Sequence, residues 1–95
     1  MLYNISMIFE WNGAKSHANK LKHGIDFETA KGLWLDENRL EIHAPHPIEN
    51  RNLVIGKIQG KCWTAVFTMR NTATRIISVR RSRAREVYLY EKETL

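Results

Sequence analysis

Arginine side chains are concentrated in one short stretch of this chain. Residues 75–85 contain five arginines and no acidic residue. An arginine keeps its charge in a protein, and its guanidinium presents five donors in a planar fork that fits phosphate oxygens. The cluster therefore predicts a surface that binds a polyanion. For a domain of 95 residues, RNA is the first candidate.

The formal net charge of +5 is unevenly distributed. Residues 1–50 hold five Lys or Arg and seven Asp or Glu, a net charge of −2, whereas residues 51–95 hold ten and three, a net charge of +7. This asymmetry predicts that one face of the fold carries a positive potential. The alternative is a solvated basic surface that only improves solubility, which explains scattered lysines better than clustered arginines.

Other kinds of site have little support in the sequence. The histidines other than His23 (His17, His43 and His46) have no metal-ligand spacing with other ligands, Cys62 has no second cysteine to pair with, and there is no glycine-rich phosphate loop. We therefore predict neither a metal nor a cofactor. No apolar run is long enough to span a bilayer, and the N-terminus lacks a signal-peptide pattern, so we expect a cytoplasmic protein.

The elements that must position these residues follow from hydrophobic periodicity and turn chemistry. The length predicts one domain over 1–95. We expect strands over 7–11, 39–43, 51–58, 62–69 and 74–80, and helices over 14–23, 27–35 and from about 84 onward. The order is β-α-α-β-β-β-β-α. It predicts an α+β fold in which helices pack on one face of an antiparallel sheet.

The predicted helices have recognisable ends and faces. Asn12 and Asp26 are good N-caps for the first two, and Gly24 suits the end of the first. In the first helix an apolar stripe at i, i+4 and i+7 predicts the core-facing side, beside a polar stripe; the apolar stripe is Ala14, Ala18 and Leu21, and the polar stripe is Lys15, Asn19 and Lys22.

In the last helix we expect Ser82 as the cap, with Glu86 one position late for a strict capping box. The inner positions of this helix are predicted to be Ala84, Val87 and Tyr88.

Three segments resemble a known family. Residues 9–30, FEWNGAKSHANKLKHGIDFETA, resemble the N-terminal signature of the BrnT toxins, F-E-W-D-x-x-K-x-x-x-N-x-x-K-H-G and onward. Residues 51–56, RNLVIG, and residues 75–80, RIISVR, followed by Glu86, resemble two later segments in the same order. The resemblance covers residues 7–91. Asn12 replaces the usual Asp and caps equally well. Family members tend to begin near the position of Met7, so residues 1–6 are expected to be an upstream extension without function.

The resemblance implies a RelE-like fold and a role in a bacterial type II toxin–antitoxin pair. Such toxins are metal-independent endoribonucleases that cleave RNA and inhibit translation. The implied partner is a BrnA-like antitoxin with a ribbon-helix-helix element. This antitoxin neutralises the toxin in a hetero-oligomer. The complex is expected to bind operator DNA only through the antitoxin. The alternative is a domain derived from such a toxin that binds nucleic acid, or regulates, without cutting.

Metal-free RNA cleavage needs a group that takes the 2′-OH proton, groups that stabilise the phosphorane, and a group that protonates the 5′-oxygen. Arg51 and Arg80 are the candidates for stabilisation, because each lies at a strand end and in a family segment. If the meander brings those ends together, the two arginines share one sheet edge. The alternatives are a structural pair of Arg80 with Glu86 and a solvated Arg51.

His23 is the acid–base candidate, because imidazole titrates near neutrality; alternatively the helix dipole alone favours it there. Glu86 either orients an arginine or acts as a base. Lys22 and Lys15 are expected to contact phosphate, although an exposed helix face explains Lys15 at least as well.

The remaining arginines, Arg81, Arg83 and Arg85, are expected to follow the RNA backbone or to contact the antitoxin.

Overall fold

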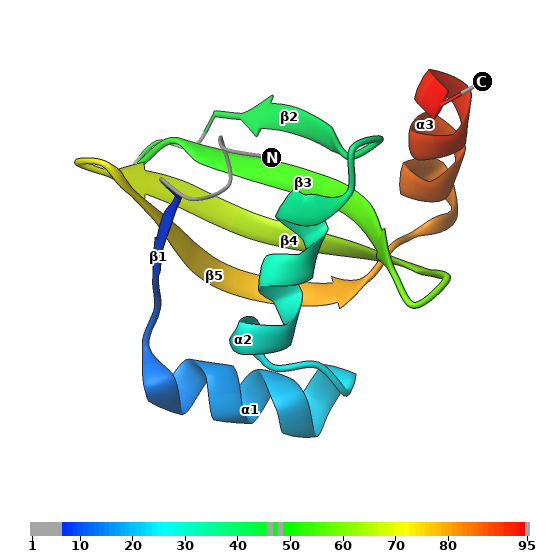
Figure 1. Ribbon diagram of the computed structural model, residues 1–95. Coiled ribbons are helices and arrows are strands. Elements are labelled where there is room, and N and C mark those ends of the chain that lie inside the picture. The colour runs from blue at the N-terminus through cyan, green and yellow to red at the C-terminus, as the bar shows by residue number, and fades with distance from the viewer. Residues whose placement is uncertain (1–6, 46, 48, 95) are drawn as a thin grey trace.

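The computed structural model describes residues 7–45, 47 and 49–94, so His46 and the proposed extension over 1–6 lie outside the described residues. The expected element order is matched in part, because a 3-10 helix, η2, continues α2 (Figure 1). The elements are β1 (Ile8–Glu10), α1 (Gly13–His23), α2 (Phe27–Ala30), η2 (Lys31–Leu35), β2 (Leu40–Ala44), β3 (Arg51–Ile58), β4 (Lys61–Arg70), β5 (Ala73–Arg81) and α3 (Ala84–Thr94).

The sheet is mixed rather than antiparallel. Its strand order is β1-β5-β4-β3-β2, and β2 to β5 form the expected antiparallel meander. However, β1 pairs in parallel with the start of β5, from Ile8 opposite Ala73 to Glu10 opposite Arg75. The prediction was wrong here because the helices between β1 and the meander form a long connection. Such a connection lets the first strand join beside the last strand in the same direction.

The two faces of the sheet are covered by different helices. Neighbouring residues of β3 point to opposite sides, so Val54 packs with Phe27, Leu33 and Trp34, whereas Ile55 packs with Cys62 and Tyr90. We call these sides the α2 face and the α3 face. The expectation that all helices pack on one face is therefore wrong for α3, because its Val87 and Tyr90 pack with Ile55 on the other side of the sheet. Figure 1 shows α3 beside the sheet and apart from α2. The central strands are apolar on both sides, and both sides need cover.

Helix α1 has the expected ends but the opposite orientation. Asn12 accepts a hydrogen bond from the Lys15 backbone, and Gly24 takes the left-handed conformation (φ 83°) that ends the helix. Its buried residues are polar, namely Ser16 and Asn19, whereas the predicted core stripe of Ala14, Ala18 and Leu21 is exposed.

Asn19 explains why α1 turns a polar side inward. Beyond the three residues that pair with β1, strand β5 has a free edge. Asn19 occupies it: its Nδ2 donates to the Val79 carbonyl (2.9 Å), and its Oδ1 accepts from the Val79 N–H (3.1 Å). The same Nδ2 donates to the Ile25 carbonyl (2.8 Å), and Ser16 accepts from the Phe27 N–H. Buried backbone groups need such partners, and this need outweighed the apolar stripe.

Helix α3 has its cap one residue later than expected and turns a different tyrosine inward. Its first intrahelical bond runs from the Val87 N–H to the Arg83 carbonyl, so Arg83 rather than Ser82 is the cap residue. Tyr88 is 57% exposed, in contrast to its predicted core position. Tyr90 is buried instead, and its hydroxyl donates to Asp36 at 2.6 Å. Burial and this bond raise the pKa of Tyr90, and they fasten α3 to the turn before β2.

Candidate ribonuclease site

The guanidinium of Arg80 is held by the carboxylate of Glu86. Arg80 lies near the end of β5 on the α3 face, because it pairs with Thr64, which pairs in turn with Ile55. Its Nη1 and Nη2 donate to the two oxygens of Glu86 at 2.7 and 2.8 Å. The Arg80 side chain is 23% exposed and that of Glu86 is 11% exposed. This bidentate pair fixes the plane of the guanidinium and leaves other donors of Arg80 available to a ligand.

Glu86 is itself held by three neighbours. One oxygen, Oε1, accepts from the Arg83 N–H (2.8 Å) and the Thr64 hydroxyl (3.0 Å) as well as from Arg80. The bond to Arg83 is the glutamate half of a capping box, because Glu86 stands three residues after the cap. Thr64 is fully buried, and its hydroxyl also bonds to Ser82 (2.8 Å).

These contacts determine the ionisation of Glu86. The hydrogen bond from Arg80 is the main cause that lowers the pKa of Glu86, to about 2; burial opposes the shift, and the bonds from Arg83 and Thr64 support it. A carboxylate with so low a pKa is a weak base near neutrality. Of the two roles expected for Glu86, the geometry favours orientation of Arg80.

Basic side chains of α1 line a hollow beside β5. Its lining includes three of the predicted site residues, Lys15, Lys22 and His23, together with Ile77 and Ser78 of β5. Its volume is about 280 Å³. His23 is half-buried and the two lysines are exposed. Neither lysine forms an ion pair with any described residue. The hollow therefore presents cationic groups to an incoming anion.

Ser78 connects this hollow to Arg80. Ser78 pairs with Val66 and Arg80 pairs with Thr64, so both side chains are on the α3 face of β5. Two residues along a strand are separated by roughly 7 Å. Between them lies Val79, whose backbone holds Asn19 of α1. The hollow and the Arg80–Glu86 pair are therefore neighbours along β5.

Arg51 lies elsewhere, at the far end of the sheet. Strands β3 and β5 run in the same direction, and Arg51 begins β3 whereas Arg80 is close to the end of β5. On β4 the partner of Asn52 is Phe67 and the partner of Arg80 is Thr64. Arg51 is therefore roughly 13 Å from Arg80 along the strands. The expectation that the two arginines share one sheet edge is wrong, because an antiparallel meander alternates strand direction.

The other predicted contacts are divided between the two sides of the sheet. Arg81 lies over the Trp63 ring, 5.4 Å from its centroid, and its Nε donates to the Cys62 carbonyl. Trp63 packs against the core of the α2 face, so Arg81 points away from Arg80. Arg83 and Arg85 are exposed around the start of α3.

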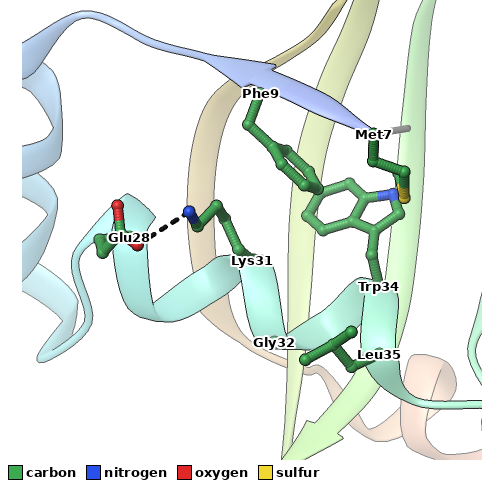
Figure 2. A pocket seen from close by; sticks show the side chains of 7 residues that line it. All are labelled: Met7, Phe9, Glu28, Lys31, Gly32, Trp34 and Leu35. Atoms are coloured by element: carbon green, nitrogen blue, oxygen red, sulfur yellow. Dashed lines mark ion pairs between the residues drawn. The ribbon is translucent and has the colours of Figure 1, made fainter. Parts of the chain in front are cut away.

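A second hollow has a different character. Figure 2 shows it between β1 and η2, lined by Met7 and Phe9 on one side and by Trp34 and Leu35 on the other. Its volume is about 350 Å³. The lysine at its rim, Lys31, is paired with Glu28 at 2.8 Å. This hollow is apolar with a neutralised rim, so it has no attraction for a polyanion comparable to that of the α1–β5 hollow.

Three residues of the site were not predicted as part of it: Thr64, Ser78 and Asn19. One feature of the sequence could have indicated Thr64. It places a hydroxyl within the apolar run of a central strand, and a buried hydroxyl requires a hydrogen-bond partner. Asn19 was assigned to a solvent-facing stripe. Its spacing one turn from Lys15 and from His23 places all three on one side of α1. Ser78 has no local signal.

Within the described ranges, no three His, Cys, Asp or Glu side chains gather as metal ligands would. Among those same residues, no helix is both long and apolar enough to cross a membrane.

Comparison with known proteins places the chain in a family. The model of one family, described as the ribonuclease toxin BrnT of type II toxin–antitoxin systems, matches residues 11–86. A search of curated proteins finds no match. The matched range includes α1, the whole meander and the glutamate that orients Arg80. The chain belongs to the BrnT family of ribonuclease toxins of type II toxin–antitoxin systems.

Proposed function

We propose that this toxin is an endoribonuclease. It cleaves RNA at internal positions by attack of a 2′-hydroxyl on the neighbouring phosphate, without a metal ion. The observation that carries the proposal is the rigid, half-buried guanidinium of Arg80 beside a hollow lined by cationic side chains. The hydroxyl loses its proton, a new P–O2′ bond forms and the P–O5′ bond breaks. The 5′-oxygen takes up a proton as it leaves, and the products are a 2′,3′-cyclic phosphate and a 5′-hydroxyl.

Arg80 acts on the phosphorane. The negative charge on its equatorial oxygens grows in the transition state, and a donor already fixed in place stabilises that charge without reorganisation. Glu86 is a positioning residue, because both of its oxygens are committed to Arg80 and one also to Thr64 and Arg83.

His23 is the proposed proton carrier. It lines the hollow and makes no hydrogen bond to any described residue, so both ring nitrogens are available to substrate. Lys15 and Lys22 hold the phosphates on either side of the reacting one. Arg51 extends the basic surface to the other end of the sheet and contacts the RNA backbone there. Arg83 and Arg85 add sequence-independent affinity at the start of α3.

In the cell, this activity would inhibit translation in the bacterial cytoplasm. The antitoxin that the family implies is proposed to be BrnA-like, with a ribbon-helix-helix element. It would hold the toxin in a hetero-oligomer and carry all contact with operator DNA.

The test is cleavage of a labelled RNA by the purified protein in EDTA, beside Arg80→Ala. We expect cleavage by the wild type, a 2′,3′-cyclic phosphate at the new end, and a rate for the variant lower by about 10²–10³. Intact RNA with a folded wild-type sample would contradict the proposal in favour of a domain that binds nucleic acid without cutting. Activity that requires added metal would contradict the mechanism alone.

A further inference from the structure

The outward side of α1 carries apolar residues that the fold does not use. Ala14, Ala18 and Leu21 are exposed, and Leu21 is 76% exposed. Their spacing of i, i+4 and i+7 places them in one stripe along the helix. Scattered exposed apolar residues are ordinary. A stripe at helical spacing, opposite an inner side made of Ser16 and Asn19, is the pattern of a helix that packs against a second partner.

The inner side of α1 is already complete. Asn19 satisfies both backbone groups of Val79 and the carbonyl of Ile25, and Ser16 satisfies Phe27. The helix is therefore fixed to the sheet by hydrogen bonds. Ala18 also lines the hollow beside β5, whereas Leu21 remains 76% exposed. The stripe is displayed on a rigid element at a defined angle, which lowers the entropic cost of binding.

The charge around the stripe indicates the chemistry of the partner. Helix α1 contains Lys15, Lys20 and Lys22 and no acidic residue. At about 100° per residue, Lys15 and Lys22 lie along one border of the stripe, whereas Lys20 lies farther round the helix, beyond His17. A partner segment that places apolar side chains on the stripe meets positive charge along the Lys15 and Lys22 border. Electrostatic complementarity then favours acidic residues on the matching border of that segment.

We propose that the outward stripe of α1 is the docking surface for an acidic amphipathic segment of the antitoxin. That a partner of this kind exists follows from the family. Lys15 and Lys22 border the stripe and also line the hollow beside β5. A segment seated on the stripe would neutralise these lysines and cover the entrance to the hollow. This mode of inhibition rests on the proposed function of the hollow, whereas the docking itself does not.

The test compares two leucines on different surfaces. Leu21 and Leu35 are 76% and 65% exposed, so each can be changed to Asp with little effect on folding. Binding of the separately purified cognate antitoxin is measured by calorimetry. We expect Leu21→Asp to weaken the affinity about tenfold or more, because it removes an apolar contact and adds repulsion toward an acidic segment. Leu35→Asp should change the affinity by less than about twofold.

A second pair of variants separates apolar contact from charge. Leu21→Ser removes only the apolar contact and should weaken binding by a smaller factor than Leu21→Asp. Lys20→Glu reverses a charge of α1 that lies outside the hollow, and the affinity of this variant should depend less steeply on salt than that of the wild type. Wild-type affinity in Leu21→Asp, with an unchanged melting curve, would overturn the docking surface. Because calorimetry needs no RNA, failure of the wild type to cleave RNA would contradict the proposed function and leave this result intact.

Discussion

Two arginines stand at opposite ends of the sheet, and the protein holds them differently. Both terminal nitrogens of Arg80 donate hydrogen bonds to Glu86, and Glu86 also accepts hydrogen bonds from Thr64 and Arg83. Among the described residues, the Arg51 side chain has one loose ion-pair contact, 4.0 Å from Glu49, and its buried Nε finds no hydrogen-bond partner there. Both residues lie in segments that resemble the same family. Two arginines in segments that resemble the same family can therefore differ in how firmly the fold orients their side chains.

The physical consequence concerns catalysis. A donor that acts on a transition state is effective when its orientation is fixed before the reaction. The Arg80 region meets that condition and adjoins the hollow that contains His23. The Arg51 region has charge without a fixed orientation, which suits contact with the RNA backbone. Four predictions test this contrast.

The largest expected effect is on the rate of cleavage. Arg80→Ala should lower the single-turnover rate by about 10²–10³, whereas Arg51→Ala should lower it by less than about tenfold. Arg80→Lys keeps the charge but loses the fork and should recover only part of the rate. Single-turnover cleavage at saturating protein measures all three. Equal losses in Arg80→Ala and Arg51→Ala would remove the distinction between the two regions.

The next effect is on stability and its dependence on pH. The pKa of Glu86 is lowered from 4.5 to about 2 in the folded state, so its stabilising contribution is complete above pH 4.5 and is lost as the pH falls toward 2. The free energy of unfolding should fall by up to roughly 3 kcal/mol over that window from this group alone.

Matched glutamine variants isolate that contribution. Glu86→Gln should flatten the acid limb of the stability curve, measured by urea unfolding at several pH values. The control, Glu49→Gln, removes the exposed partner of Arg51 and should change stability by less than about 1 kcal/mol. An unchanged acid limb in Glu86→Gln would show that Glu86 does not hold Arg80 as described.

A smaller effect is expected where α1 joins β5. Asn19→Ala leaves the Val79 N–H and carbonyl without partners at a buried edge, which should cost about 2–3 kcal/mol. The exposed neighbour Ala18→Ser should cost less than about 1 kcal/mol. Thermal and urea unfolding give both values. The prediction fails if the two variants are equally stable.

The smallest effect is expected at Arg51 itself. Arg51→Ala removes a buried Nε that has no hydrogen-bond partner in the described part of the chain, so we expect stability to change by less than about 1 kcal/mol. The affinity of this variant for RNA should fall modestly. The slope of log affinity against log salt should become less steep by about one unit, which corresponds to one lost phosphate contact. Filter binding at several salt concentrations measures this slope. A stability loss like that of Glu86→Gln would mean that Arg51 is also held by the fold.

Local signals in the sequence predicted the elements well. Asn12, Gly24 and Asp26 cap the helices as expected, because a cap depends on the few residues beside it. Strand β3 has the predicted bounds, and β4 and β5 differ from prediction by one residue at each end. Alternation and turn residues act over similarly short distances.

The incorrect predictions concern which side chains of α1 and α3 face the interior. Asn19 faces inward because β5 has a free edge, and nothing within α1 shows that edge. Tyr90 rather than Tyr88 is buried because Asp36, far away in the chain, offers it a partner. Both decisions depend on groups that only the folded chain brings near.

The sequence by itself determined the elements and the concentration of positive charge in the second half, because these depend on local spacing and composition. It offered the pairing of Arg80 with Glu86 only as an alternative, and the structure decided that the pair forms. Only the tertiary structure decided that Arg51 and Arg80 occupy opposite ends of the sheet and that the lysines and histidine of α1 meet β5 near Arg80. Strand direction and register set those distances, and they arise from pairing between segments that are remote in the chain.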